Sequence, residues 1–145
     1  MNEEALKLDH QLCFPLYACA RRVVGFYTPY LKPLGLTYTQ YIAFLALWET
    51  PEMTVKELGR RLMLDSGTLT PMLKKLEENG YLVRSRSRED ERMVTVTLTE
   101  RGRQLKEQVK GIPGSVGSCM PLDAQEAVTL YQLLYKVLRQ ASDPD

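Results

Sequence analysis

The fold is decided by the stretch from Thr54 to Leu98, which reads TVKELGRRLMLDSGTLTPMLKKLEENGYLVRSRSREDERMVTVTL. Thr54 and Glu57 have the spacing of a capping box, in which each side chain bonds the other residue's backbone amide, so we expect a helix to begin at Val55. A second helix is expected from about Gly67, after a run of residues that favour helix starts. The period then changes to two, which is typical of strands. The stretch predicts a winged helix-turn-helix, in which two short helices precede a two-stranded hairpin.

The second helix of this stretch begins with small polar residues. Gly80 after Asn79 supplies a left-handed stop at its other end. Free amides at a helix start can bind phosphate, and short side chains there can reach base edges in a major groove. The candidate DNA-binding residues on this helix are Ser66, Gly67, Thr68, Thr70, Pro71, Lys74 and Lys75.

The hairpin that follows carries a loop rich in charge. In its first strand, Tyr81 and Val83 alternate with the more solvent-facing positions Leu82 and Arg84. Leu82 is an exception to this pattern, and we expect it to pack under the start of the hairpin. An arginine beside a narrow minor groove reads the shape and A·T content of DNA. The alternative is a solvated hairpin whose acidic residues offset the cations, but the neighbouring helix pair favours DNA contact. The candidate cations are Arg84, Arg86, Arg88 and Arg92.

Composition is consistent with this interpretation. At 145 residues with 44% hydrophobic content, the chain is long enough for one domain with its own core. The net charge is only +1, but residues 54–103 hold 11 basic and 8 acidic residues, whereas residues 1–53 and 104–145 each hold 4 basic and 5 acidic residues. Cations therefore concentrate where DNA is expected. Without a signal peptide or a membrane-length apolar run, we expect a cytoplasmic protein.

The number and spacing of the three cysteines and the single histidine argue against a disulfide framework and against a zinc site. An odd number in a cytoplasmic chain does not form a disulfide framework, and no His/Cys spacing suits zinc. We therefore expect no metal and no cofactor.

One apolar helix is expected from about Asp9 to Leu31. Pro15 falls inside that pattern, so either the helix is kinked there or its regular part begins near Phe14. In both cases Cys13 lies in the first turns, where the positive end of the helix dipole favours the reactive thiolate. The alternative is that Cys13 is a small buried hydrophobe.

The rest of the chain is expected to be helical. A largely apolar helix should cover Tyr38 to Glu49 near the centre of the domain, with 49–53 as a link to the winged stretch. A further helix should run from about Thr99 to Lys110, be interrupted over 112–118, and be followed by a last helix from Asp123 to about Gln140. The last helix has more apolar surface than a small winged domain needs. Long apolar helices at both ends favour a two-fold dimer over a monomeric bundle.

At the level of motifs, the chain resembles the MarR family of regulators and, within it, the OhrR group that senses organic hydroperoxides. The family-level motif is DER at Asp90–Arg92 followed by VTVTLTERG at Val94–Gly102. The subgroup motifs are QLCF at Gln11–Phe14, LTYTQY at Leu36–Tyr41 and LDSGTLTPMLKKLE at Leu64–Glu77. The resemblance covers nearly the whole chain. It implies a single domain over 1–145, with dimerisation helices in 1–36 and 104–145 and the winged helix-turn-helix in 54–98.

The resemblance also implies roles for individual residues. Cys13 would be the peroxidatic thiol, with Tyr27 and Tyr38 as its hydrogen-bond donors and with Tyr17 and Phe14 beside it, in a pocket across a dimer interface. The resulting sulfenic acid would be resolved either by Cys119 of the other subunit or by a small thiol, and Cys19 is expected in the core. Asp90 would steady the wing while Arg92 enters the minor groove.

The leading hypothesis is therefore a homodimeric repressor that binds operator double-stranded DNA and releases it when an organic hydroperoxide oxidises Cys13. A second hypothesis is a repressor of the same family that is relieved by reversible binding of a small aromatic ligand. A third is a thiol peroxidase, which the all-helical surroundings of Cys13 disfavour. We therefore expect no enzymatic activity.

Overall fold

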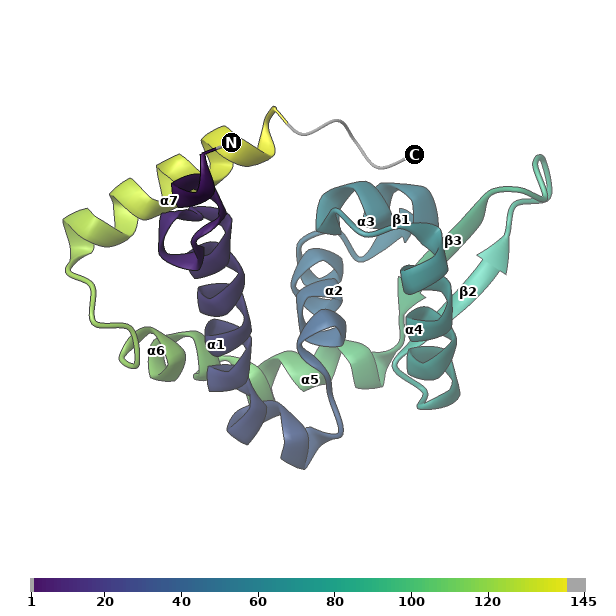
Figure 1. The fold of residues 1–145 in the computed structure, drawn as a ribbon. Helices are drawn as coiled ribbons and strands as arrows, with labels where there is room; N and C mark the ends of the chain where they lie inside the picture. Colours follow the sequence, from purple (N-terminus) through teal and green to yellow (C-terminus); the bar gives the residue numbers. More distant parts are fainter. Residues whose placement is uncertain (1, 141–145) are drawn as a thin grey trace. The chain divides into compact units, whose positions relative to one another are not determined.

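The computed structural model describes residues 2–140. The chain divides into two compact units, Met1–Tyr38 and Thr39–Asp145, and helices predominate in both (Figure 1). The elements in order are η1 Glu3–Leu6, η2 Leu8–His10, α1 Cys13–Leu31, η3 Lys32–Leu34, α2 Tyr38–Glu49, β1 Glu52–Thr54, α3 Val55–Leu62, α4 Ser66–Glu78, β2 Leu82–Arg86, β3 Val94–Leu98, α5 Glu100–Val109, α6 Ile112–Gly117 and α7 Ala124–Leu138.

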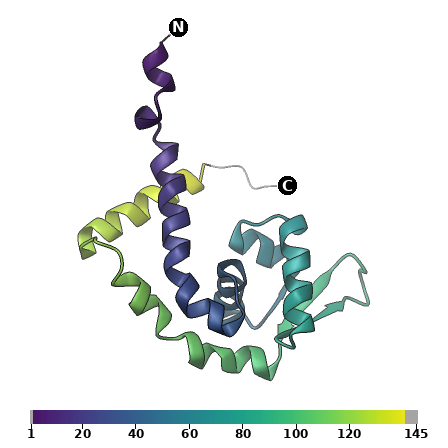
Figure 2. The same cartoon turned by 60° about the horizontal axis from the view of Figure 1, so that its bottom comes forward.

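The first unit is built on α1. The prediction that Asp9 begins this helix is wrong, because Asp9 lies in η2 and an extended Gln11 separates the two helices. Of the two possibilities for Pro15, the later start of the regular helix is confirmed: Pro15 is the third residue of α1, where a missing amide leaves no internal bond unmade. Figure 2 shows the two short 3-10 helices leading into α1.

The apolar pattern of α1 is not matched by burial within the chain. Leu31 is its only buried residue, and the prediction that Cys19 belongs to the core is wrong, because its side chain is exposed. Helical periodicity shows that a face prefers to leave water, but it does not show which surface covers that face. In the described residues, the apolar face of α1 before Leu31 is largely open.

The core of the second unit forms around α2, as expected for a central helix. Six of its residues are buried. Phe44 stacks on Trp48 with ring centroids 5.5 Å apart and meets the edge of Tyr81 at 5.4 Å. The leucines of the helix-turn-helix complete this core, and Leu58, Leu69, Leu73 and Leu76 are fully buried.

The sheet has three strands in the order β1-β3-β2, all antiparallel. The sequence predicts only the hairpin, so β1 corrects the expectation of a link over 49–53. Three residues are too few to show an alternating pattern, and Pro51 beside them favours a loop interpretation. Leu82 is buried, as expected, but Val83 is 52% exposed, so the apolar and solvent-facing residues of β2 do not alternate as predicted.

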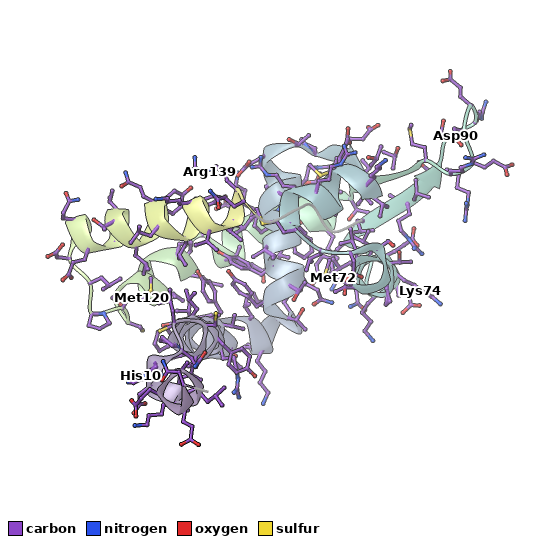
Figure 3. All side chains as sticks on the ribbon, turned by 45° about the horizontal axis from the view of Figure 1, so that its top comes forward. His10, Met72, Lys74, Asp90, Met120 and Arg139 are labelled. Atoms are coloured by element: carbon purple, nitrogen blue, oxygen red, sulfur yellow. The ribbon has the colours of Figure 1, made fainter. Side chains whose placement is uncertain are left out.

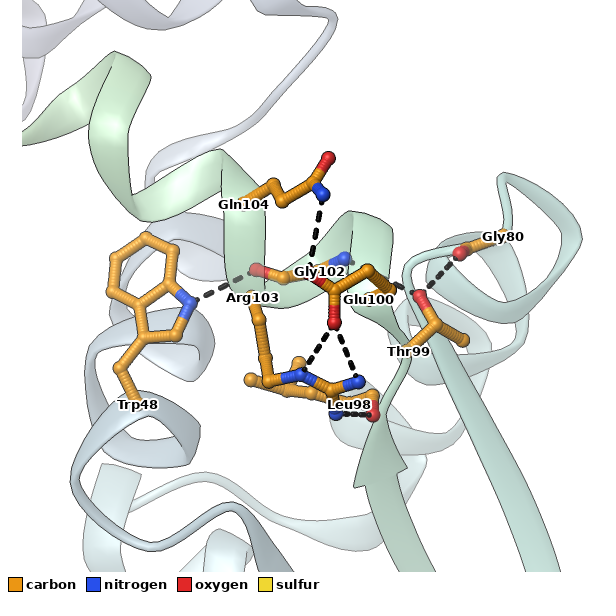
Figure 4. A network of polar contacts seen from close by, with 8 residues as sticks. All are labelled: Trp48, Gly80, Leu98, Thr99, Glu100, Gly102, Arg103 and Gln104. Atoms are coloured by element: carbon orange, nitrogen blue, oxygen red, sulfur yellow. Dashed lines mark hydrogen bonds and ion pairs between the residues drawn. The ribbon is translucent and has the colours of Figure 1, made fainter.

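A polar junction fixes α5 against the rest of this unit (Figure 4). The indole Nε1 of Trp48 donates to the carbonyl of Gly102 at 2.9 Å, and the Thr99 hydroxyl donates to the carbonyl of Gly80 at 2.6 Å. Gly102 also packs against the backbone of Tyr81, so closely that a Cβ there would lie 2.2 Å from the Tyr81 carbonyl oxygen. Only glycine allows this approach.

The C-terminal part has one more helix than expected. Residues 112–118 were expected to interrupt the helices, but α6 covers Ile112–Gly117. Pro113 is compatible with it, because Pro113 occupies the second helical position, where no internal hydrogen bond needs its amide. The break falls at 118–123. The last helix, α7, begins with a capping box between Asp123 and Glu126, and none of its residues is buried.

Candidate nucleic-acid interface and thiol site

The winged helix-turn-helix of residues 54–98 is called the reading head below. Its first helix, α3, has the predicted capping box. The Glu57 amide donates to the Thr54 hydroxyl at 3.1 Å, and the Thr54 amide donates to the Glu57 carboxylate at 2.8 Å. The bond from the Thr54 amide to the carboxylate is the largest cause of a Glu57 pKa below its ordinary value. The helix ends at Leu62 and is followed by Met63, whose backbone is left-handed with φ 55°. The cap therefore fixes where α3 begins, and Met63 fixes the turn into α4.

The second helix, α4, begins one residue before the predicted start. The Asp65 carboxylate accepts from the Thr68 amide at 2.8 Å, as an N-cap does. Pro71 is the sixth residue of the helix, just past the first turn, so it removes the amide that would otherwise donate to the Gly67 carbonyl. The predicted DNA-binding residues Ser66, Gly67, Thr68, Thr70, Pro71, Lys74 and Lys75 are all exposed.

The wing loop is held by its own hydrogen bonds. Asp90 accepts from the Arg92 amide at 3.0 Å, and the Ser87 hydroxyl accepts from the Glu89 amide at 3.2 Å. Arg86 crosses the loop and donates to the carbonyl of Glu91 at 2.9 Å. Asp90 lies at the far end of the hairpin, and Lys74 points outward from α4 (Figure 3). Arg88 and Arg92 are exposed on this loop.

Arg84 occupies a different position from the other predicted cations. Its Nε and Nη2 donate to the Glu77 carboxylate at 3.1 and 3.0 Å, and its backbone amide donates to the same group at 2.8 Å. The backbone bond is the largest cause of a lowered Glu77 pKa. The pair joins the last turn of α4 to β2. Arg84 therefore positions the wing relative to α4 instead of reaching outward.

A groove of about 1100 Å³ lies between the helix pair and the wing. It is open to solvent and combines cationic, hydroxyl and thioether side chains. Its size and mixed lining suit a polymer with both phosphates and base edges better than a small apolar ligand. The residues that line it include Lys56, Arg60, Met63, Asp65, Ser66, Thr70, Arg84, Arg86, Asp90, Arg92 and Met93.

The predicted thiol site is incomplete within one chain. Cys13 is the first residue of α1 and is exposed. Tyr27 lies on the same helix fourteen residues later, which is about 21 Å along the axis at about 1.5 Å per residue. Tyr27 and Tyr38 do lie together, with ring centroids 4.9 Å apart. Burial raises the pKa of Tyr38 above 10.0, and the electrostatic interaction with Tyr27 raises it further. The Tyr38 phenol is therefore protonated at neutral pH.

The other predicted members of this site are exposed. Phe14 and Tyr17 lie in the first turns of α1, where the Arg21 guanidinium lies 5.5 Å from the ring centroid of Tyr17. Cys119 lies in the turn after α6, as expected, and its thiol is 3.5 Å from the carbonyl of Ser115. Within residues 2–140, no cluster of three or more His, Cys, Asp or Glu side chains could hold a metal ion, and no helix has the length and apolar character to cross a membrane.

The fold and the groove define a winged-helix transcriptional regulator that binds DNA. A family model described as transcriptional regulator SarA/Rot matches residues 25–109. An organic hydroperoxide resistance transcriptional regulator of Bacillus subtilis is 47% identical over 133 residues, which cover 92% of this chain and 90% of that protein. The chain belongs to the MarR/SarA family of transcriptional regulators, as the motifs predicted.

Solved structures agree with this assignment. The structure of reduced AbfR bound to DNA is 40% identical, with a TM-score of 0.78, over 96% of this chain and 97% of that one. A disulfide-formed AbfR structure has a TM-score of 0.65 at 40% identity, over 95% and 97% of the two chains. A mutant of Escherichia coli MarR complexed with operator DNA has a TM-score of 0.74 at 30% identity, over 88% and 93%. These relatives are regulators and not enzymes, which confirms that part of the prediction.

Proposed function

We propose that the chain acts as a homodimeric repressor that releases operator double-stranded DNA when an organic hydroperoxide oxidises Cys13. The observation that carries this proposal is the exposed thiol of Cys13 at the start of α1 in a chain that resembles a regulator of organic hydroperoxide resistance. The proposal has three parts, a DNA-binding face, a dimer and a thiol switch.

The DNA-binding face is the groove between α4 and the wing. The polar start of α4 would enter the major groove with Ser66 and Thr70, while Lys74 and Lys75 contact phosphates. Arg92 would enter the adjacent minor groove, since Asp90 holds the backbone of Arg92 at the end of the wing. The DNA-bound structure of AbfR supports this choice, because its similarity covers 96% of this chain.

The dimer would form through the two ends of the chain, residues 1–36 and 104–145. All of α7 and nearly all of α1 is outside the core of the chain, although both helices carry large apolar side chains. Surface of this kind is typical of subunit interfaces. The exposed apolar residues of these two helices are Phe14, Leu16, Tyr17, Val24, Tyr30, Val128, Leu130, Tyr131, Leu133, Leu134, Tyr135, Val137 and Leu138.

The thiol switch needs the second subunit. Because about 21 Å of helix separates Cys13 from Tyr27 within one chain, we assign the phenol donors near each Cys13 to the partner's copies of Tyr27 and Tyr38. The protonated Tyr38 phenol would donate to the thiolate. Phe14 and Tyr17 would supply an apolar wall that favours a greasy peroxide over hydrogen peroxide.

The reaction would begin with attack of the Cys13 thiolate on a peroxide oxygen. The O–O bond breaks, an alcohol leaves, and the sulfur becomes a sulfenic acid. Cys119 of the other subunit or a small thiol would then form a disulfide with it and release water. AbfR is a relative with a disulfide-formed structure, which supports a disulfide as the final state. That bond would move the helices that carry the reading heads.

The test compares Cys13→Ser with a matched control. Cys19→Ser removes another exposed thiol, six residues further along α1. We expect one equivalent of cumene hydroperoxide to release a fluorescent duplex, selected from a random pool by the reduced protein, from wild type and Cys19→Ser but not from Cys13→Ser. Mass spectrometry would then distinguish a Cys13–Cys119 crosslink from a mixed disulfide. Release from Cys13→Ser at one equivalent would refute the switch. Release by an aromatic acid under reducing conditions would favour ligand control instead.

A further inference from the structure

Two of the exposed methionines lie in the same groove. Among residues 2–140 the exposed methionine side chains are Met63 at 51%, Met93 at 46% and Met120 at 37%. Met63 and Met93 both line the groove between the helix pair and the wing, and Met120 does not. Met53 and Met72 are partly buried. The thioethers most open to solvent are therefore on the surface proposed to bind DNA.

The backbone holds both side chains in place. Met63 follows α3 with φ 55°, and the Met63 and Leu64 amides donate to the carbonyls of Arg60 at 3.3 Å and Gly59 at 3.0 Å. This is the helix ending in which glycine is the usual residue. A methionine there bears the strain of a left-handed backbone, and that backbone presents its thioether to the groove.

Met93 is fixed at the other wall. Its amide donates to the carbonyl of Asp90 at 3.0 Å, and its carbonyl accepts from the Ser87 amide at 2.8 Å. These two bonds close the base of the wing loop, so the position of Met93 follows that of the wing. Arg60 and Arg92 line the same groove. Each thioether therefore shares the groove with two exposed guanidinium groups.

We propose that Met63 and Met93 form a second oxidation site, at which an organic hydroperoxide converts the thioethers to sulfoxides and weakens DNA binding. This inference rests on the proposed function, since it takes the groove as the DNA-binding face and an organic hydroperoxide as the oxidant. It adds a response that needs no cysteine. Methionine sulfoxide is reversible by reductases, so the modification is a switch and not only damage.

The chemistry is a two-electron oxygen transfer. A lone pair of the thioether sulfur attacks the outer peroxide oxygen, the O–O bond breaks, and a sulfur–oxygen bond forms. The sulfur is oxidised by two electrons, and the proton of the transferred oxygen moves to the departing alkoxide, which leaves as an alcohol. The new oxygen is polar and accepts hydrogen bonds. It would compete with phosphates for the groove's arginines and would remove apolar contact with thymine methyl groups.

The two sites would respond at different doses. A neutral thioether is a weaker nucleophile than a thiolate, so one equivalent of peroxide reacts at Cys13 and an excess is needed for Met63 and Met93. Bound DNA would cover the groove and shield both methionines, while Met120 lies outside the groove. The modification therefore acts on DNA-free protein and delays rebinding.

The experiment uses the full chain with all three cysteines replaced by serine, treated with excess tert-butyl hydroperoxide. We expect peptide mass spectrometry to show a gain of about 16 Da at Met63 and Met93, and affinity for the selected duplex to fall by about tenfold, which is about 1.4 kcal/mol. Methionine sulfoxide reductases should restore it. Met63→Leu with Met93→Leu should resist the loss, and Met120→Leu should not. If the serine variant does not fold, wild-type protein alkylated at its cysteines replaces it.

Three outcomes would overturn the inference. The first is full affinity for the duplex when both sulfoxides are present. The second is a loss of affinity in the double leucine variant as large as in the parent protein. The third is that all three methionines are oxidised to the same extent whether or not the duplex is bound. These results can be distinguished from failure of the thiol switch. The thiol switch is tested by measuring release of the duplex at one equivalent of peroxide from the double leucine variant with Cys13 intact.

Discussion

Replacing Gly102 with alanine should cause a large loss of stability. The new Cβ would lie 2.2 Å from the Tyr81 carbonyl oxygen and 3.0 Å from Leu98 Cδ2, so α5 and the turn at Tyr81 would have to separate. Overpacking of this kind costs about 1–3 kcal/mol. The shift would also strain the hydrogen bonds from the Thr99 amide to the Tyr81 carbonyl and from Trp48 to the Gly102 carbonyl, each of which contributes about 1 kcal/mol.

Against these losses, alanine gains about 0.5–1 kcal/mol of helix stability over glycine. The net expectation is a loss of about 3 kcal/mol, or a Tm lower by about 6–12 °C for a chain of this size. Urea unfolding followed by circular dichroism measures it. Gly114→Ala is the matched control, because its Cβ would meet nothing within 4 Å in α6, and it should be neutral or stabilising. A Gly102→Ala variant within about 1 kcal/mol of wild type would refute the close-approach argument.

Three further predictions concern the reading head. Glu77→Gln should lower the free energy of unfolding by about 1 kcal/mol at pH 7. Because the folded-state pKa of Glu77 lies below its ordinary 4.5, this difference should persist above about pH 4.5 and vanish as the pH falls through the lowered pKa. A pH-independent difference in urea midpoints would contradict the ion pair with Arg84. Asp65→Ala should cost about 1 kcal/mol through loss of the α4 cap, measured by the same unfolding assay, and no change would mean that another group caps the helix. Arg92→Ala should reduce the slope of log K against log salt in duplex titrations by about 1, and an unchanged slope would remove the wing from the DNA interface.

The parts of the fold that could be predicted depend on local chemistry. The capping box at Thr54, the Asp65 cap and the left-handed Gly80 each arise from contacts within a few residues. Their signal is contained in short stretches of sequence, so the helix boundaries in the reading head agree with the prediction to within one residue. The α2 helix follows for a similar reason, since an almost continuous apolar run is recognisable without its neighbours.

The parts that could not be predicted depend on distant partners. The strand β1 exists because β3 pairs with it across about forty intervening residues of sequence. Arg84 resembles any other cation in a basic loop, and only the fold brings Glu77 to it. The exposure of Cys19 shows the same limit. An apolar stripe on a helix predicts that this face is buried, but it does not tell whether residues of the same chain or of a partner bury it.

The bond between Trp48 and Gly102 has a practical consequence for studying the molecule. The chain contains one tryptophan, and its indole nitrogen donates to the backbone of α5, the helix that leads from the wing into the C-terminal segment. Indole emission shifts in wavelength when this hydrogen bond or its surroundings change. Ultraviolet-excited fluorescence would therefore follow, without any attached dye, whether oxidation of a distant sulfur loosens the joint between the wing and the C-terminal helices.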